Sequence, residues 1–187
     1  MIPFELYGIS FPTKESRLTW RNFCREFSQQ FGLICFSEDW RNPVIWSHYA
    51  NKHRGLALGF EIPKNHLIEV KYRDKRRSFP NLTDTDSSEL APLLLDVLSR
   101  KFKHWEYEKE LRTFLNLEER DKETGLFFKN FDENLKLVKV VIGSASNLNS
   151  ARIRSAVPDI RNLEIITARL AFSSFDVVTQ KDKRLQR

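Results

Sequence analysis

The stretch YEKELRTFLNL, which runs from Tyr107 to Leu117, marks a change in the hydrophobic pattern of the chain. Apolar and polar side chains alternate along it: Leu111, Leu115 and Leu117 alternate with Glu110, Arg112 and Asn116. Alternation with a period of two is typical of a strand that buries one face. We therefore predict a half-buried strand in this stretch.

The sequence that follows predicts more β structure and one short helix. Four apolar runs read as further strands: GLFFKNF (125–131), LKLVKVVIGS (135–144), LEIITARLAF (163–172) and FDVV (175–178). The helix is expected in SNLNSARIRSAV (146–157), where Pro158 would end it.

Earlier in the chain the pattern is helical. Apolar side chains recur at helical spacing through residues 14–31: Trp20, Phe23, Cys24, Phe27 and Phe31. Thr13 is placed to cap this helix, and Gly32 is placed to stop it in a left-handed conformation.

Two more helices are expected. One spans about Pro43 to Ala50, begun by the proline and ended by Gly55. The other begins near Asp86 or Ser88, with Glu89 close to its N-terminus. Its apolar stripe consists of Leu90, Leu93, Leu94, Val97, Leu98 and Phe102.

Strands and one long loop lie between these helices. LICFS (33–37), LALGFEI (56–62) and LIEVKY (67–72) read as strands, and residues 73–88 as a polar loop. Strands and helices that do not strictly alternate predict an α+β fold. We expect a mixed or mostly antiparallel sheet with three to four helices, a single compact domain over residues 1–187, and a basic tail at 180–187.

Length and composition narrow the class of protein. The 187 residues suit one domain, and fifteen Phe and four Trp must fill much of its core. No apolar run approaches the ~18 residues needed to cross a bilayer, and MIPFELYGIS lacks the features of a secretory signal, so we expect no membrane partner. Cys24 and Cys35 have no CxxC spacing, which favours the reducing cytoplasm. Between Ile34 and Phe36, Cys35 is expected to be a buried thiol.

The net charge of +6 is concentrated in two places, KYRDKRR (71–77) and QKDKRLQR (180–187). A solvated basic surface is one interpretation of these runs. Attraction to nucleic acid or to an anionic small molecule is the other.

An acidic pair stands where the strand of the opening stretch begins. If that strand starts early enough, Glu108, Glu110 and Arg112 share one face of it. Two such carboxylates are found in enzymes that cleave glycosidic bonds, where one stabilises a sugar with oxocarbenium character and the other helps a nucleophile lose its proton. The alternative is that Glu108 and Glu110 pair with Arg112 and nearby Lys side chains on a solvated face.

A second cluster, rich in rings, lies in VIWSHYANKHRGLALGF (44–60). Trp46, His48, Tyr49 and His53 offer stacking faces and hydrogen-bonding groups, or else fill a corner of the core. The two histidines are five positions apart with no carboxylate between them, so we expect no metal site.

Four segments resemble, in order, the prokaryotic family catalogued as domain of unknown function 2971. They are CFSEDWRNPVIWSHYANKHRGLALGFEI (35–62), VKY (70–72), KHWEYEKELR (103–112) and VVIGS (140–144). Members of that family begin with a segment similar to LYKYR, a strand and an FNDPFE-like turn. Here Pro3, Phe4 and Glu5 resemble the end of that turn. The resemblance thus implies that the N-terminal strand is absent, either because the protein is shortened or because another chain supplies that piece. If the lost segment helps to bind substrate, this copy is expected to be inactive.

A weaker resemblance is to ADP-ribosyltransferases, in which a late ExE element follows a middle strand with aromatic or hydroxyl groups. Glu108-Lys109-Glu110 is similar to ExE, and the WSHYA block to the middle element. The resemblance implies that Glu110 orients a ribose hydroxyl and stabilises its developing charge, that Glu108 positions the acceptor, and that Tyr49 or Trp46 stacks on nicotinamide.

The remaining residues expected to bind substrate under this resemblance are His48, His53, Arg54, Trp105 and Arg112. NAD would be the substrate, no cofactor would be tightly bound, and the protein would serve in defence or as a toxin. The alternative is a nucleic-acid-associated or protein-interaction module without catalysis, in which the two motif blocks only pack in the core. The sequence leaves the oligomeric state open.

Overall fold

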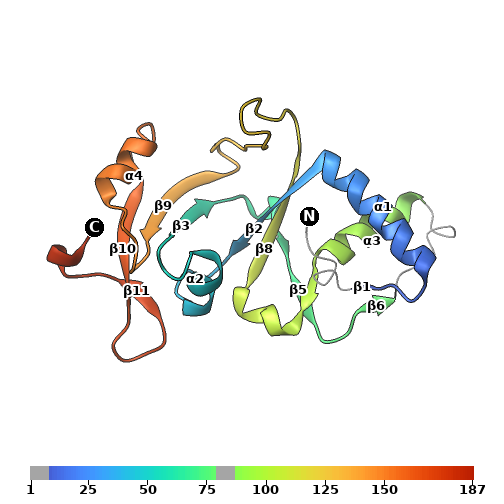
Figure 1. Cartoon of the computed structure of the whole chain (residues 1–187), viewed down its shortest axis with the longest axis horizontal. Helices are drawn as coiled ribbons and strands as arrows, with labels where there is room; N and C mark the ends of the chain where they lie inside the picture. Colours follow the sequence, from blue (N-terminus) through green and yellow to red (C-terminus); the bar gives the residue numbers. More distant parts are fainter. Residues whose placement is uncertain (1–8, 79–86) are drawn as a thin grey trace. The chain divides into compact units, whose positions relative to one another are not determined.

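The computed structural model describes residues 9–78 and 87–187, which fall into two compact units (Figure 1). Unit 1 contains the chain up to Glu38 and from Asn65 to Lys129, and unit 2 contains Asp39–Lys64 and Asn130–Arg187. Helices and mixed or antiparallel sheets confirm the α+β class. The single domain over 1–187 stays a prediction. Pro3, Phe4 and Glu5, the centre of the predicted 73–88 loop and a helix start at Asp86 lie outside the described residues.

Helix α1 (Lys14–Gln30) in unit 1 begins where the sequence predicts. The Thr13 hydroxyl accepts a hydrogen bond from the Ser16 N–H at 3.0 Å, and the Ser16 hydroxyl accepts one from the Thr13 N–H at 3.2 Å, which closes a capping box. The predicted left-handed stop at Gly32 is wrong. The helix ends at an extended Phe31, and Gly32 continues into strand β2, where a Cβ atom would lie 2.9 Å from Leu117 Cδ2.

Helix α3 (Ser87–Leu98) packs on α1 through a cluster centred on Trp20 and Val97 (Figure 1). It ends four residues before the predicted Phe102. Ser99 N–H donates to Leu95 O at 2.9 Å, and Ser99 O then accepts from Lys71 N–H at 2.7 Å. After this second bond the chain continues as strand β7 (Arg100–Phe102), so Phe102 does not belong to the apolar stripe of the helix.

The strands of unit 1 form a three-stranded antiparallel sheet in the order β2-β8-β4 and two parallel pairs. The bounds of the sheet strands are β2 Phe31–Ser37, β8 Glu110–Asn116 and β4 Ile68–Glu69. The parallel pairs join β5 (Lys71–Arg73) to β7, and β1 (Ile9–Ser10) to β6 (Arg77–Ser78). The 3₁₀ helix η4 (Lys103–Glu108) links β7 to β8.

The single strand predicted at residues 67–72 is divided into β4 and β5. Val70 between them donates its N–H to Glu110 O at 3.0 Å, while Lys71 turns to Ser99. The two short strands therefore join different partners, β8 and β7, around a buried Val70.

The strand predicted at residues 125–131 is wrong, because this segment is irregular. It follows a turn in which Thr124 N–H and hydroxyl both donate to Asp121 Oδ1, at 2.8 and 2.7 Å, and Gly125 has a φ of +68°. The Phe128 side chain is 69% exposed, so the apolar run has no buried face to pair.

Unit 2 holds a four-stranded mixed sheet in the order β11-β10-β9-β3, parallel between β9 and β10 and antiparallel elsewhere. The strands are β3 Leu56–Glu61, β9 Lys136–Ile142, β10 Glu164–Leu170 and β11 Val177–Thr179. The helices of this unit are α2 Pro43–Tyr49 and α4 Ser150–Ala156, with the 3₁₀ helix η5 at Lys183–Leu185; η2 spans Lys64–His66 at the boundary between the units.

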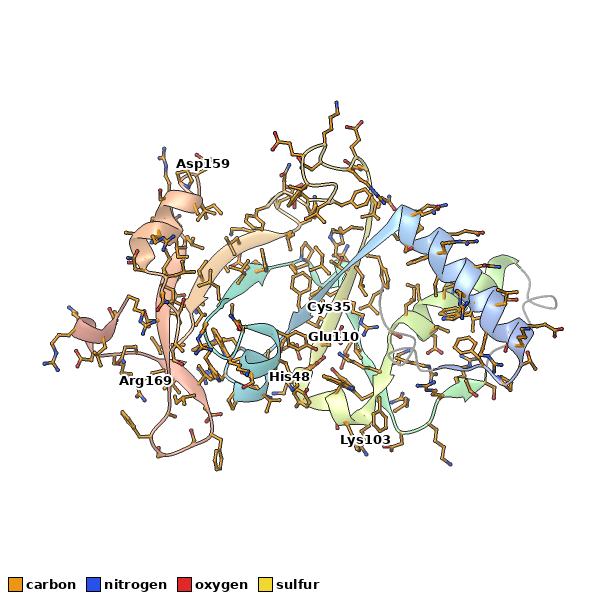
Figure 2. All side chains as sticks on the ribbon, in the orientation of Figure 1. Cys35, His48, Lys103, Glu110, Asp159 and Arg169 are labelled. Atoms are coloured by element: carbon orange, nitrogen blue, oxygen red, sulfur yellow. The ribbon has the colours of Figure 1, made fainter. Side chains whose placement is uncertain are left out.

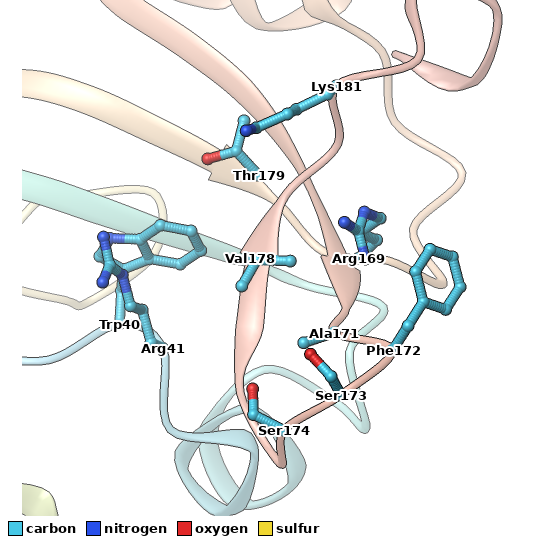
Figure 3. A pocket seen from close by; sticks show the side chains of 10 residues that line it. All are labelled: Trp40, Arg41, Arg169, Ala171, Phe172, Ser173, Ser174, Val178, Thr179 and Lys181. Atoms are coloured by element: carbon cyan, nitrogen blue, oxygen red, sulfur yellow. The ribbon is translucent and has the colours of Figure 1, made fainter.

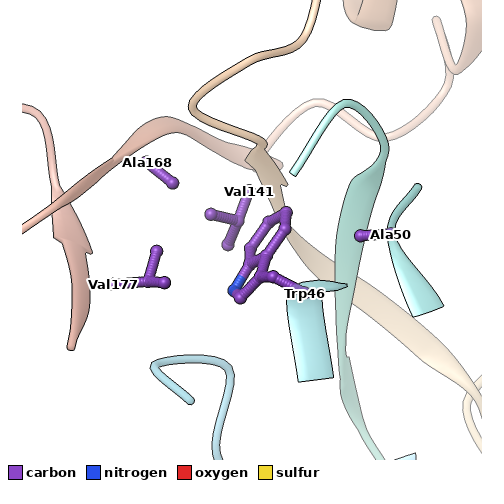
Figure 4. Close-up of a cluster of buried hydrophobic side chains, with 5 residues drawn as sticks. All are labelled: Trp46, Ala50, Val141, Ala168 and Val177. Carbon is purple, nitrogen blue, oxygen red and sulfur yellow. The ribbon is translucent and has the colours of Figure 1, made fainter. Parts of the chain in front are cut away.

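Two apolar clusters form the core of unit 2. The first joins Trp46 and Ala50 to Val141, Ala168 and Val177 (Figure 4). The second joins β9 to α4 and consists of Leu137, Val140, Ile142, Ile153 and Leu163. Since neighbouring side chains of a strand point to opposite faces, Val141 and Val140 serve different clusters. Within the described part of the chain, no helix has the length and apolar content needed to span a bilayer.

Candidate functional site

The acidic pair of unit 1 converges on one buried ammonium group. Lys101 Nζ donates to Glu108 Oε2, and to Glu110 Oε2 at 2.8 Å. All three residues are at least 94% buried. From the spacing of two we expected both carboxylates to lie on one face of a strand. Instead, Glu108 is the last residue of η4, and only Glu110 belongs to β8. Lys109 between them adopts a left-handed conformation, with a φ of 45°, that turns both carboxylates toward Lys101.

Arg112 completes this group, two positions after Glu110 on the same face of β8. Its Nε donates to Glu110 Oε1 at 2.8 Å and its Nη2 to Oε2 at 3.3 Å, while Nη1 donates to Leu98 O. We call Lys101, Glu108, Glu110 and Arg112 the charge cluster. Its two cations pair with its two anions, so the expected pairing of the carboxylates with Arg112 and a nearby Lys is confirmed. The expected solvated face is wrong, because all four side chains are buried.

The surroundings of Glu110 keep its carboxylate ionised. Desolvation alone would raise its pKa, but hydrogen bonds from Arg112, Cys35 and Lys101 outweigh it and lower the pKa to about 2. Desolvation likewise opposes the charge of Lys101, yet hydrogen bonds to Glu108 and Glu110 raise its pKa. Both groups are therefore charged at neutral pH.

Cys35 lies beside Glu110 on the neighbouring strand (Figure 2). The prediction of a buried thiol is wrong: Cys35 in the edge strand β2 is exposed. Desolvation by nearby protein atoms, together with the hydrogen bond to Glu110 and the charge of that carboxylate, nevertheless raises the pKa of Cys35 to about 12. The thiol is consequently neutral and donates to Glu110.

Aromatic rings border the charge cluster. The Tyr72 hydroxyl oxygen accepts the Glu110 N–H at 2.8 Å, and the Trp105 ring lies 5.1 Å from Lys101 Nζ. Tyr72 and Trp105 are half-buried. Sequence reasoning named Trp105 but missed Tyr72 and Lys101; the VKY segment contains Tyr72, whereas Lys101 stood inside a predicted helix with nothing to distinguish it.

The oxygens of Glu110 are fully used. They accept from Arg112 Nε, Arg112 Nη2, Lys101 Nζ and the Cys35 thiol, and a carboxylate offers about four lone-pair sites. Of these donors the thiol is the weakest and the only exposed one. A ligand hydroxyl that reached Glu110 would therefore take the place of Cys35.

The ring-rich segment belongs to unit 2, and its residues divide into core and surface. Trp46 is 98% buried and donates its indole N–H to Trp40 O at 2.6 Å. His53 stacks on it, with centroids 5.9 Å apart and planes inclined by 6°. Desolvation lowers the pKa of His53. Trp46 is buried and offers no ring face to a ligand, so we leave it out of the proposed binding surface.

The other predicted substrate-binding residues of this segment are on the surface. His48, Tyr49 and Arg54 are exposed, and the Tyr49 side chain is 64% accessible. That these residues converge with Glu108 and Glu110, which belong to unit 1, stays a prediction.

Unit 2 also contains a hollow that was not predicted from the sequence (Figure 3). Its volume is about 450 Å³, and Trp40 and Arg41 line it together with residues around the β10–β11 turn. No periodic pattern distinguishes Arg169 or Phe172 in the sequence, so only the fold brings them to Trp40. Among the residues described, no group of three or more His, Cys, Asp or Glu side chains is arranged to hold a metal ion.

Comparisons with known proteins return no match: no family model, no curated protein and no solved structure matches the chain. The two family resemblances therefore stay predictions that rest on the quoted motifs.

Proposed function

We propose that the protein is ADP-ribosyltransferase-like and acts on NAD or a related nucleotide, with Glu110 as the group that stabilises charge on the ribose. The substrate would reach Glu110 at the exposed thiol of Cys35, where a ribose hydroxyl replaces the thiol as a hydrogen-bond donor. NAD is a substrate in this proposal and not a tightly bound cofactor.

The observation that supports this proposal is the state of the Glu110 carboxylate. A pKa of about 2 makes it a poor proton acceptor, so it is unsuited to act as a general base. The same low pKa keeps it negative, and Arg112 and Lys101 hold it in one orientation. A fixed anion of this kind suits a reaction in which positive charge develops on a sugar carbon.

The proposed reaction breaks the bond between the ribose C1′ and the nicotinamide nitrogen. The bonding electron pair leaves with nicotinamide, which becomes neutral, and an acceptor hydroxyl or a water molecule bonds to C1′ and releases one proton to solvent. Glu110 stabilises the positive C1′ while Arg112 and Lys101 hold Glu110 in place, and Glu108 positions the acceptor. Trp105 is the proposed substrate-binding residue of unit 1, whereas Arg112 is buried and bonded to Glu110 and is left out, as Trp46 is. Substrate binding by His48, Tyr49, His53 and Arg54 of unit 2 stays a prediction.

The test is release of nicotinamide from labelled NAD, with water and with candidate protein or nucleic-acid acceptors. We expect Glu110→Gln to lower the rate by about 10² or more, since a neutral amide cannot stabilise the developing charge. Glu106→Gln is the matched control, because Glu106 lies in the same motif but is exposed. It should retain the wild-type rate.

Two results would overturn the proposal. One is a wild-type protein that neither binds nor cleaves NAD, which would leave the interaction module without catalysis. The other is an equal loss of rate in Glu106→Gln and Glu110→Gln. A role in defence or as a toxin is proposed only together with this activity.

A further inference from the structure

We propose that unit 2 binds single-stranded nucleic acid along two hollows that share Arg169. This inference is independent of the proposed function, because the charge cluster belongs to unit 1. It rests on the side chains that line the hollows, on their charge and on the rings exposed at the turn after β10.

The first hollow has a cation and an aromatic ring on each of two walls (Figure 3). On one wall Arg41 lies 5.9 Å from the Trp40 ring, and on the other Arg169 lies 4.5 Å from the Phe172 ring. Lys181 adds a third cation. Rings and cations placed in this way suit a base that stacks while its phosphates meet Arg or Lys.

The walls of this hollow are held by the core beneath them. Trp40 O accepts the Trp46 indole N–H, and Arg41 O accepts the Val177 N–H at 2.8 Å. The turn after β10 is closed by a hydrogen bond from Ala171 N–H to Asp176 O, also at 2.8 Å. The backbone positions of the lining side chains are thus set before any ligand arrives, which lowers the cost of binding.

The second hollow, of about 380 Å³, continues from Arg169 and adds the cationic side chains of Arg184 and Arg187. Gln180 and Gln186 provide amide groups there. Asp182 pairs with Arg184 at 2.8 Å and neutralises part of its charge. The basic lining therefore extends past a single nucleotide.

The charge of both hollows favours an anion. No Asp or Glu side chain lines either of them. Three carboxylates lie nearby, and each is engaged: Asp39 accepts from the Arg41 N–H at 2.9 Å, Asp176 accepts from the Ser174 hydroxyl at 2.6 Å, and Asp182 pairs with Arg184 at 2.8 Å. Within residues 9–78 and 87–187, no carboxylate pairs with Arg41, Arg169 or Lys181.

Exposed rings favour a single strand over a duplex. Phe172 and Phe175, on the turn between β10 and β11, are 94% and 96% exposed. Rings left in water in this way have little use in the fold, yet they can stack on unpaired bases, whose faces a duplex covers. Stacking of this kind is tolerant of sequence, so we expect little base preference.

The test is the fluorescence anisotropy of a labelled single strand of about 12 nucleotides. The affinity should fall steeply between about 50 and 200 mM salt. Phe172→Ser should weaken binding by about fivefold or more, because one stacked base is lost. Arg169→Glu should weaken it more and flatten the salt dependence.

Arg161→Glu is the matched control, since it makes the same change of charge at an exposed residue outside both hollows and should bind almost as the wild type does. The Phe175→Ser variant tests the contribution of a second ring to binding. The Phe175 side chain is 96% exposed, so its replacement does not put folding at risk. Equal loss in Arg161→Glu and Arg169→Glu would overturn the proposal. So would undetectable binding at low salt, or equal affinity for a mononucleotide, for duplex DNA and for the single strand.

Discussion

Lys101 is the residue on which the candidate site of unit 1 depends. Its ammonium group donates to both Glu108 and Glu110, and the three side chains are 6% exposed or less. Two buried carboxylates would repel each other if this cation were removed, since only Arg112 would remain to compensate them. The charge cluster is therefore stable only as a complete set.

Removing that cation gives the first prediction. Lys101→Met should lower the free energy of unfolding by about 3–5 kcal/mol, because it leaves buried negative charge without its partner. Urea denaturation followed by circular dichroism would measure the change. Lys103→Met is the control: Lys103 is half exposed and faces Asp74 at 3.7 Å, so about 0.5 kcal/mol or less is expected. Similar losses in both variants would contradict the account.

Glu110 gives a prediction about acid stability. Its pKa is lowered from 4.5 to about 2 in the folded protein, so its contribution is fully present above about pH 4.5 and is lost as the pH falls through 2. The shift corresponds to about 3 kcal/mol. Unfolding free energies measured between these pH values should fall more steeply in the wild type than in Glu110→Gln. A Glu106→Gln variant should lose unfolding free energy with falling pH as steeply as the wild type does. Parallel curves of unfolding free energy against pH for all three proteins would disprove the role of Glu110.

Several features of this site could be predicted from the sequence, and others could not. The spacing of Glu110 and Arg112 placed them on one face, as the structure confirms. The hydrophobic pattern could not predict the role of Lys101. This residue meets Glu108 and Glu110 only because α3 ends at Leu98 and the chain continues as strand β7. Cys35 was expected to be buried because Ile34 and Phe36 beside it are apolar, but neighbouring side chains of a strand point to opposite faces, and that of Cys35 is exposed.

Among the elements, the turn from η4 into β8 has the greatest effect on the site. Lys109 in this turn has a φ of 45° and a ψ of 55°, a conformation that few residues other than glycine and asparagine adopt readily. The turn also bonds to the neighbouring strand end, since Glu38 N–H donates to Lys109 O at 3.2 Å. The side chain of Lys109 is exposed.

This turn yields a prediction about the backbone. Lys109→Gly should be neutral or stabilising, because glycine adopts a positive φ without a steric penalty. Lys109→Val should cost about 1–2 kcal/mol and weaken the convergence of Glu108 and Glu110, because a β-branched residue resists that conformation. Thermal unfolding of the two variants would measure the difference, and a valine variant as stable as the glycine variant would contradict it.

The elements that the sequence predicted well are those with strong local signals. The cap at Thr13 and the proline at the start of α2 are examples. The errors arose where pairing or a turn decided the outcome. Val70 divides a predicted strand because its neighbours bond to different partners, and residues 125–131 lose strand structure after the Asp121 turn. Neither effect is visible in local periodicity.

In the whole molecule, each unit carries its own candidate chemistry. Unit 1 holds the charge cluster and the exposed Cys35, and unit 2 holds the basic and aromatic hollows around Arg169. Composition suggested one domain of this size but could not indicate that the chain leaves unit 1 after Glu38 and returns at Asn65. The first hollow depends on residues more than 120 positions apart in the sequence, such as Trp40 and Arg169, which explains why no sequence motif predicted it.

The proposed function requires that substrate reach Glu110, and the reactivity of Cys35 reports on that access. In a Cys24→Ala background only Cys35 can react with an alkylating reagent. Because its pKa is raised to about 12, its alkylation rate should keep rising well above pH 9, where an ordinary thiol levels off at about pH 8.5–9.5.

The most direct measurement is the alkylation rate of Cys35 as NAD is added at a fixed alkaline pH. If NAD binds at Glu110, it covers the exposed thiol of Cys35, so the rate should fall by about tenfold or more and then saturate once NAD exceeds its Kd by that factor. The same NAD should leave the rate unchanged in a folded Glu110→Gln variant. A wild-type rate that is the same at every NAD concentration would contradict the account.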